Sequence, residues 1–183
     1  MRLLPALALC VVVLTSSTLA AKVPDSEARL RPQDARLTNL LRQGAARSTT
    51  FKALVDRIEG SNVIVYVAQN PLMKKNLSGM LTWMTRAGGY RYLRASISTD
   101  LTPDQMIATL AHELQHAVEV IEDESVTDEA SLIALYRRIG RQNGSAAPMR
   151  WETIAAQETG FKVRRELASP ASTAVRSGDS TRS

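Results

Sequence analysis

The sequence predicts an α+β domain, in which a short antiparallel or mixed sheet packs against a long central helix and further helices surround it. Helical patterns open and close the chain, and β-branched runs lie between them. A strongly capped helix follows the last of these runs directly. The 183 residues contain no internal repeat and are enough for one domain with its own hydrophobic core.

The N-terminus has the order of residues found in secretory signal peptides. A short basic start precedes an apolar run, Leu3 to Leu14, and small and polar residues follow up to Ala20. The run is short for a bilayer span, which favours cleavage over the alternative of an uncleaved membrane anchor. We therefore expect residues 1–20 to be removed, leaving no stable membrane anchor, and the chain to be exported as a periplasmic or secreted protein.

Two further segments are expected to lie outside the folded domain. Residues 21–31 are predicted to be a linker, and residues 168–183 a disordered tail because they offer few large apolar side chains for burial. The domain is then expected over residues 32–167. Cys10 is the only cysteine and lies in the signal peptide, so the mature chain has no thiolate to bind a metal.

The formal net charge of +5 comes from basic residues that are scattered singly or in pairs. The sequence has no long basic run and no basic patch interleaved with aromatic residues, so we expect no nucleic-acid partner. A solvated surface of mixed sign is the simpler interpretation of this charge.

Two helices are predicted at the start of the domain. The first begins near Pro32, which fits a first helical turn, and ends at Gly44. Its apolar face is formed by Leu37, Leu40 and Leu41. The second begins at Ser48 or Thr49, both capping residues, and ends before Gly60. Its apolar face is formed by Phe51, Leu54, Val55 and Ile58.

Three strands and a long helix are predicted next. The strands are Asn62–Ala68, Leu81–Thr85 and Tyr90–Ser98, and Gly88 and Gly89 supply the turn between the last two. The long helix has Thr102, Pro103 and Gln105 in a capping-box pattern. Its apolar stripe is formed by Met106, Ile107, Leu110, Ala111, Leu114, Ala117, Val118 and Ile121. Two more helices are expected over Thr127–Ile139 and from Arg150 or Trp151 to Leu167.

The H-E-x-x-H pattern of zinc peptidases occurs at residues 112–116 of the long helix. His112 and His116 are four residues apart, about 6 Å along one helical face, so both imidazoles can bind one zinc ion. Glu113 is placed to act as the general base that takes a proton from a zinc-bound water. These are the only two histidines in the chain, which weighs against the alternative of two unrelated surface histidines.

Leu114 lies at the centre of the apolar stripe, and the helical wheel places His112 and His116 each about 160° away from it. Around them the helix carries small or uncharged residues, and Glu119 is the only charge on that side. We therefore expect the helix to pack on the sheet with one face and to present the metal to a cleft with the other.

The third zinc ligand must be a carboxylate, because no histidine remains. Glu119 lies on the same straight helix, about 10.5 Å along the axis from His112, which is too far for both to bind one ion. Glu129 falls in the first turn of the next predicted helix, and Glu158 has cations at helical spacing, so each has a sufficient structural role.

Glu152 is the ligand we predict. In the predicted last helix its face carries small and mostly apolar residues and offers no cation, so a buried carboxylate there needs a partner such as a metal. Its alternative role is that of an acidic residue at a helix N-terminus. Glu129 and Glu158 remain the next candidates.

Ala111–Ala117, Trp151–Thr153 and Gly160–Leu167 together resemble exported bacterial proteins related to the gluzincin metallopeptidases. The resemblance covers roughly residues 90–167. It implies a small zincin-like domain, one zinc ion, Glu113 as general base, Glu152 as glutamate ligand, and a peptide or protein substrate. The chain departs from the larger gluzincins in lacking their Asn-Glu-x-x-x-Asp motif and a histidine to stabilise the tetrahedral intermediate.

A substrate strand is expected along Tyr90–Ser98, which directly precedes the zinc-binding helix. Tyr90, Tyr92 or Tyr136 could donate a hydrogen bond to an oxyanion, the alternative being that each only packs. The leading hypothesis is thus an exported zinc-dependent hydrolase, most simply a peptidase. The alternatives are a non-catalytic zinc-binding or partner-binding module that keeps the scaffold, and a domain without metal.

Overall fold

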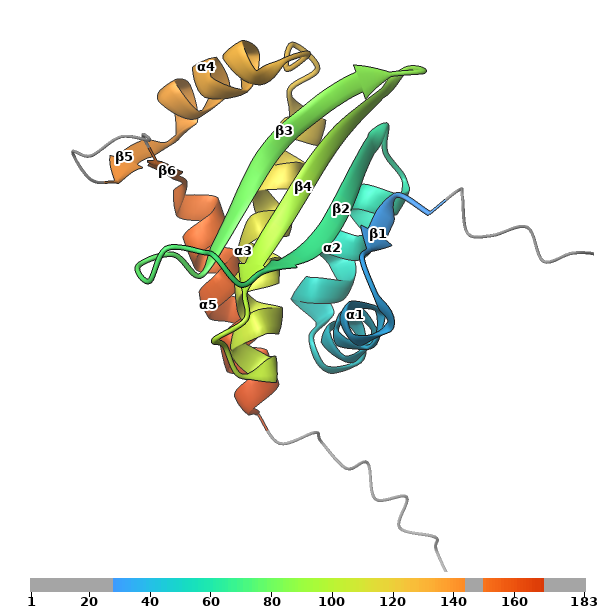
Figure 1. The fold of residues 1–183 in the computed structure, drawn as a ribbon, viewed down its shortest axis with the longest axis vertical. Coiled ribbons are helices and arrows are strands. Elements are labelled where there is room, and N and C mark those ends of the chain that lie inside the picture. Colours follow the sequence, from blue (N-terminus) through green and yellow to red (C-terminus); the bar gives the residue numbers. More distant parts are fainter. Residues whose placement is uncertain (1–27, 144–149, 170–183) are drawn as a thin grey trace, which may run out of the picture.

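The computed structural model describes residues 28–143 and 150–169 (Figure 1). The predicted signal peptide, residues 1–20, and all but the first residues of the predicted tail lie outside the described residues. Among the described residues, no helix has the length and apolarity needed to cross a membrane.

A mixed four-stranded sheet forms one layer of the domain, in the order β1-β2-β4-β3 (Figure 1). Its strands are β1 (Leu30–Pro32), β2 (Val63–Asn70), β3 (Gly79–Ala87) and β4 (Tyr90–Ser98). The first two and β4 run parallel, whereas β3 is antiparallel to β4 and lies at the edge. Gly88 and Gly89 form the predicted turn, with φ of 57° and 81°. The predicted α+β class is confirmed.

The start of the domain differs from the prediction. Leu30 lies in the expected linker, but it is buried and pairs with β2, so the fold begins before residue 32. Pro32 ends β1, and α1 (Ala35–Arg47) begins after Asp34, whose side chain accepts a hydrogen bond from Leu37. Pro32 therefore closes a strand and does not open a helix.

Gly44 was expected to end the first helix, but it lies inside α1 and is buried. A Cβ added there would lie 2.9 Å from the ring of Phe51 on α2 (Thr49–Glu59). The glycine thus permits a close contact between the two helices. Ser48 caps α2 as predicted, and the ring of Phe51 is fully buried.

The long helix α3 (Pro103–Glu122) is the centre of the fold, and its predicted capping box is present. It packs against the sheet, α2 and α5 (Ile154–Ala168). A Cβ added to Gly160 of α5 would lie 3.4 Å from the Cβ of His112. Helix α5 therefore covers part of the side of α3 that was expected to face a cleft, and His116 is only 5% exposed.

The C-terminal region contains a short strand pair that the sequence did not predict. Helix α4 (Glu129–Ile139) begins two residues later than expected, after the capping residue Asp128. Strands β5 (Arg141–Asn143) and β6 (Arg150–Glu152) then pair antiparallel. The helix predicted from Arg150 or Trp151 begins only at Ile154, because residues 150–152 form β6 and Thr153 is the N-cap.

Candidate metal centre

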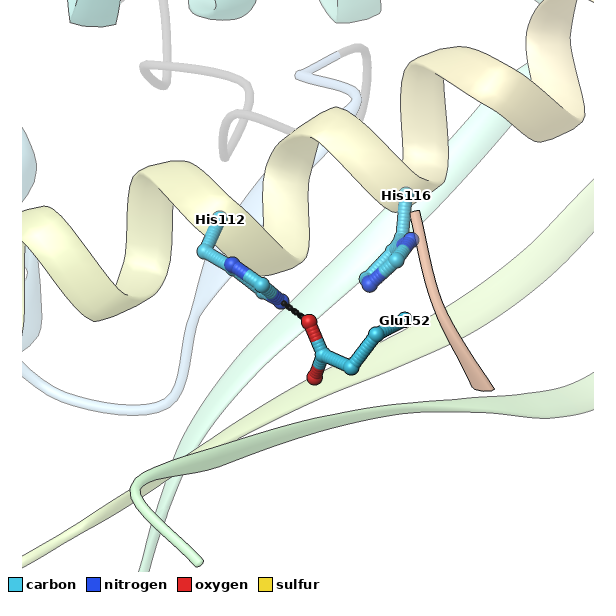
Figure 2. Close-up of side chains that lie close together, drawn as sticks. All are labelled: His112, His116 and Glu152. Carbon is cyan, nitrogen blue, oxygen red and sulfur yellow. Dashed lines mark ion pairs between the residues drawn. The ribbon is translucent and has the colours of Figure 1, made fainter. Parts of the chain in front are cut away.

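The three predicted ligands lie together in the structure. Ligand atoms of His112, His116 and Glu152 all lie within 4.8 Å of one another. Figure 2 shows the two imidazoles reaching down from α3 and the Glu152 carboxylate turned toward them. His112 Nε2 lies 3.3 Å from Glu152 Oε2. Ligand atoms bound to one tetrahedral zinc at about 2.0–2.1 Å are about 3.3 Å apart, so the donor set fits this metal.

The position of Glu152 was predicted for a reason that the structure contradicts. It is the last residue of β6, so it shares no helical face with the small residues of α5. The pairing of β5 with β6 positions it instead, with Arg141 as its register partner. Glu129 and Glu158 are both exposed and do not belong to the cluster.

His112 and Glu152 shift each other's ionisation. Burial works against the charged form of His112, but the hydrogen bond to Glu152 and the nearby carboxylate of Glu113 raise its pKa above the ordinary value. Burial likewise works against the Glu152 carboxylate, and its hydrogen bond to His112 lowers the pKa of Glu152 below the ordinary value. Each residue thus stabilises the charged form of the other, the imidazolium of His112 and the carboxylate of Glu152.

Glu119 orients His116 from the same helix. His116 Nδ1 lies 2.8 Å from Glu119 Oε2, and both side chains are buried. Because a carboxylate only accepts, Nδ1 carries the proton and Nε2 keeps its lone pair for a metal. The hydroxyl of Thr153 donates to the other oxygen of Glu119 at 2.5 Å. One carboxylate therefore connects His116 to the residue that follows Glu152.

This role of Glu119 was not predicted. Its distance along the helix excluded it from the predicted ligands, and the cluster in the structure does not include it. The available signal was its position three residues after His116, which places the two side chains on one face. Gln157 is a second partner found only in the structure, since its amide donates to Glu152 Oε2 at 3.4 Å.

Glu113 lies beside the cluster, between α3 and the edge strand β3. It is 5% exposed and accepts a backbone hydrogen bond from Leu81. A Cβ on Gly79 would lie 2.5 Å from Glu113 Oε1, so only glycine leaves room for this carboxylate. Burial is the largest effect on Glu113 and raises its pKa, which the neighbouring histidines partly counteract. A carboxylate with a raised pKa suits proton transfer near neutral pH.

Of the three tyrosines considered as oxyanion donors, Tyr136 lies at the site. Its ring packs edge-on against His116, with centroids 5.2 Å apart, and its hydroxyl donates to the His116 carbonyl at 3.4 Å. Burial, with the charges of Glu119 and Glu113, raises its pKa well above the ordinary value, so the hydroxyl stays protonated. Tyr90 and Tyr92 lie on β4 and do not line the cavities at the cluster.

Two cavities meet at the cluster and share His112, Glu113 and Glu152 in their walls. The larger, of about 520 Å³, lies between β3 and α4. Its apolar lining includes Leu81, Trp83, Leu132, Ile133 and Trp151. The smaller, of about 400 Å³, opens toward α5. Its lining includes Asn76, Ser78, Gln157, Phe161 and Arg164.

The predicted substrate strand is wrong in position. Strand β4 (Tyr90–Ser98) is bonded on both sides, to β2 and to β3, and has no free edge. The edge strand beside the cluster is β3, because it begins at Gly79 and passes Leu81, which contacts Glu113. A further strand can therefore pair only with β3 on this side of the sheet.

Comparisons with protein-family models, with curated proteins and with solved structures found no match. The evidence for a function therefore lies in the residues and geometry of the site.

Proposed function

We propose that this chain is an exported zincin-type hydrolase that binds one zinc ion and cleaves peptide bonds. His112, His116 and Glu152 are its metal ligands, and Glu113 is its general base. The observation that carries the proposal is the convergence of three donor atoms, within 4.8 Å of one another, from two elements far apart in the sequence. Catalytic zinc sites characteristically have three protein ligands of this kind.

The three proposed ligands leave one coordination position of a tetrahedral zinc ion open. Zinc bound by three protein ligands retains a position at which it can polarise a carbonyl and activate water. The hydrogen bond from His116 to Glu119 fixes the imidazole ring, and Gln157 holds the Glu152 carboxylate. These hydrogen bonds orient His116 and Glu152 before a metal binds.

Glu113 supplies the proton transfers. Its carboxylate accepts a proton from the attacking water and then delivers it to the leaving amine. The backbone N–H of Leu81 holds the carboxylate in place, and burial keeps bulk water away from it. The free edge of β3 gives a peptide main chain a place to pair directly beside Glu113.

The test combines metal analysis with a hydrolysis assay. Purified wild type should contain one equivalent of zinc and cleave members of a defined peptide mixture, followed by mass spectrometry. Glu113→Gln should keep the zinc and lose turnover, whereas His116→Ala should lose both. Retained hydrolysis by zinc-loaded Glu113→Gln would refute the role of Glu113.

Two other outcomes distinguish the alternatives. Stoichiometric zinc without hydrolysis of any peptide would favour the non-catalytic module. Zinc far below one equivalent in the wild type would favour a domain without metal.

A further inference from the structure

The smaller cavity beside the cluster contains one arginine and no lysine among the described residues that line it. This residue, Arg164, is exposed on α5. Its guanidinium lies over the Phe161 ring, 6.0 Å from the centroid, and has no hydrogen bond or ion pair within residues 28–143 and 150–169. Arg47 and Arg138, by contrast, each pair with an aspartate.

The position of Arg164 relative to the cluster follows from α5. Gly160 contacts His112, because a Cβ there would lie 3.4 Å from the His112 Cβ. Arg164 is four residues later, so it lies on the same helical face about 6 Å farther along the axis. An extended peptide rises about 3.3 Å per residue. A group one to three residues from the reacting bond therefore reaches this guanidinium.

The two cavities differ in chemistry. The larger one has mainly apolar walls from β3, α4 and β6. The smaller one combines the guanidinium of Arg164 with amide and hydroxyl side chains. Its two carboxylates, Glu113 and Glu152, belong to the cluster end, where His112 pairs with Glu152. The end away from the cluster thus presents a positive charge without a described acidic partner.

We propose that the smaller cavity is a subsite for a carboxylate of the substrate and that Arg164 binds it. A planar guanidinium with five N–H donors matches a carboxylate, which it can bind through two parallel hydrogen bonds. The carboxylate belongs either to an acidic side chain or to the C-terminus of a peptide. This inference rests on the proposed zinc hydrolase function and assigns Arg164 as a specificity residue of the same site.

The experiment uses binding, so that it does not depend on turnover. Zinc-loaded full-length chain is titrated calorimetrically with three succinyl hydroxamate dipeptides, each anchored at the metal by its hydroxamate. The first carries glutamate and a C-terminal amide, and the second carries glutamine and a C-terminal amide. The third carries glutamine and a free C-terminal carboxylate. The second probe is neutral, and the other two separate the sources of a carboxylate.

At least one carboxylate probe should bind wild type about tenfold or more tightly than the neutral probe. Arg164→Gln should remove this preference, and Arg164→Lys should retain part of it because the positive charge remains. Arg165→Gln is the matched control, since Arg165 is the exposed neighbour on α5 and lines neither cavity. The preference of Arg165→Gln for the carboxylate probe over the neutral probe should equal that of wild type.

Three results would overturn the subsite. The first is equal affinity of wild type for all three probes. The second is a preference that survives Arg164→Gln. The third is an equal loss of affinity for every probe in that variant, which would assign Arg164 to packing against Phe161. A chain that holds no zinc would instead refute the proposed function itself, and metal analysis before the titration reports this separately.

Discussion

Helix α5 has a carboxylate near each end, Glu152 just before its N-cap and Glu166 in its last turn. Glu166 accepts four hydrogen bonds from the start of α2, two of them at 2.5 and 2.7 Å from Ser48 and Thr50. Glu152 has two described partners, His112 at 3.3 Å and Gln157 at 3.4 Å. The Glu166 carboxylate thus accepts four hydrogen bonds within the protein, two of them short, whereas the Glu152 carboxylate retains capacity for a ligand.

This difference indicates that Glu166 stabilises the fold, whereas Glu152 is available to bind a ligand. At the N-terminus of α2, the Glu166 carboxylate accepts a hydrogen bond from the backbone N–H of Thr50, which has no partner within the helix. A carboxylate held by two long hydrogen bonds beside two histidines contributes little to stability and can exchange those bonds for a metal. Substitutions at the two ends should therefore separate zinc binding from unfolding.

The largest effect is expected for Glu152→Ala. Loss of a ligand should weaken zinc binding by more than the roughly 10- to 100-fold that loss of a supporting partner causes. Hydrolysis should disappear with the metal, while the free energy of unfolding of the metal-free chain changes by less than about 1 kcal/mol. Competition with a chelator and urea denaturation measure the two quantities. Wild-type zinc affinity in this variant would refute Glu152 as a ligand.

Tyr136→Phe tests whether the buried hydroxyl acts on the substrate. If it donates to an oxyanion, kcat should fall about 100-fold while zinc content stays the same. If Tyr136 only packs against His116, the loss of one hydroxyl should change kcat less than about threefold, and thermal stability should show the effect instead. Single-turnover kinetics on zinc-loaded protein, with Tyr66→Phe on β2 as control, distinguishes these results.

Glu119→Gln tests the orientation of His116. The amide can still accept a hydrogen bond, but it removes the charge that favours a proton on His116 Nδ1. Zinc affinity should fall about 10- to 100-fold, without loss of the ligand set. Chelator competition measures it against Glu122→Gln, an exposed control at the end of the same helix. An unchanged affinity would show that Glu119 only joins α3 to α5.

The part of this site that lies on one helix was predictable from the sequence. The spacing of His112, Glu113 and His116 fixes the relative positions of their side chains, because the α-helix has a regular geometry. Local signals also gave the helix caps at Ser48 and Thr102. Such features depend on contacts between residues that are close in the sequence, and a sequence pattern can therefore predict them.

The remaining features depend on pairing between distant segments. Strand β6 forms only because β5 lies beside it, and three residues carry too little pattern to be recognised. The choice of edge strand depends on β2 pairing with β4, which inserts β4 inside the sheet. The structure places Glu152 beside the two histidines, as predicted, but the predicted helix that carried it is incorrect. Glu152 was selected by excluding other acidic residues, whereas its position beside the histidines depends on strand β6.

Glu166→Gln should reduce stability at the other end of α5 and leave zinc affinity unchanged. The expected loss in the free energy of unfolding is about 1–2 kcal/mol, because the amide keeps some hydrogen bonds but loses the charge. Urea denaturation of the metal-free chain measures it. A comparable loss of zinc affinity would show that the two ends of α5 are coupled.

The same carboxylate predicts a pH dependence. Burial would raise the pKa of Glu166, but hydrogen bonds from Ser48 and Thr50 outweigh it and lower the pKa below the ordinary value of 4.5. Its stabilisation is therefore complete above about pH 4.5 and is lost as the pH falls through the lower pKa of the folded state. Wild type should lose stability relative to Glu166→Gln over this acidic range. If the stability of wild type and that of Glu166→Gln changed equally with pH, the lowered pKa of Glu166 would be contradicted.

The smallest effect is expected for Arg47→Gln, although Arg47 contacts Leu167, the residue that follows Glu166. Its guanidinium pairs with Asp104 at 2.6 Å and donates to the Leu167 carbonyl at 3.1 Å. Both charged side chains are 40–50% exposed, so water screens the pair and the expected loss is about 0–1 kcal/mol. Denaturation at low and high salt checks this. A loss larger than that of Glu166→Gln would mean that α1, and not α2, anchors the end of α5.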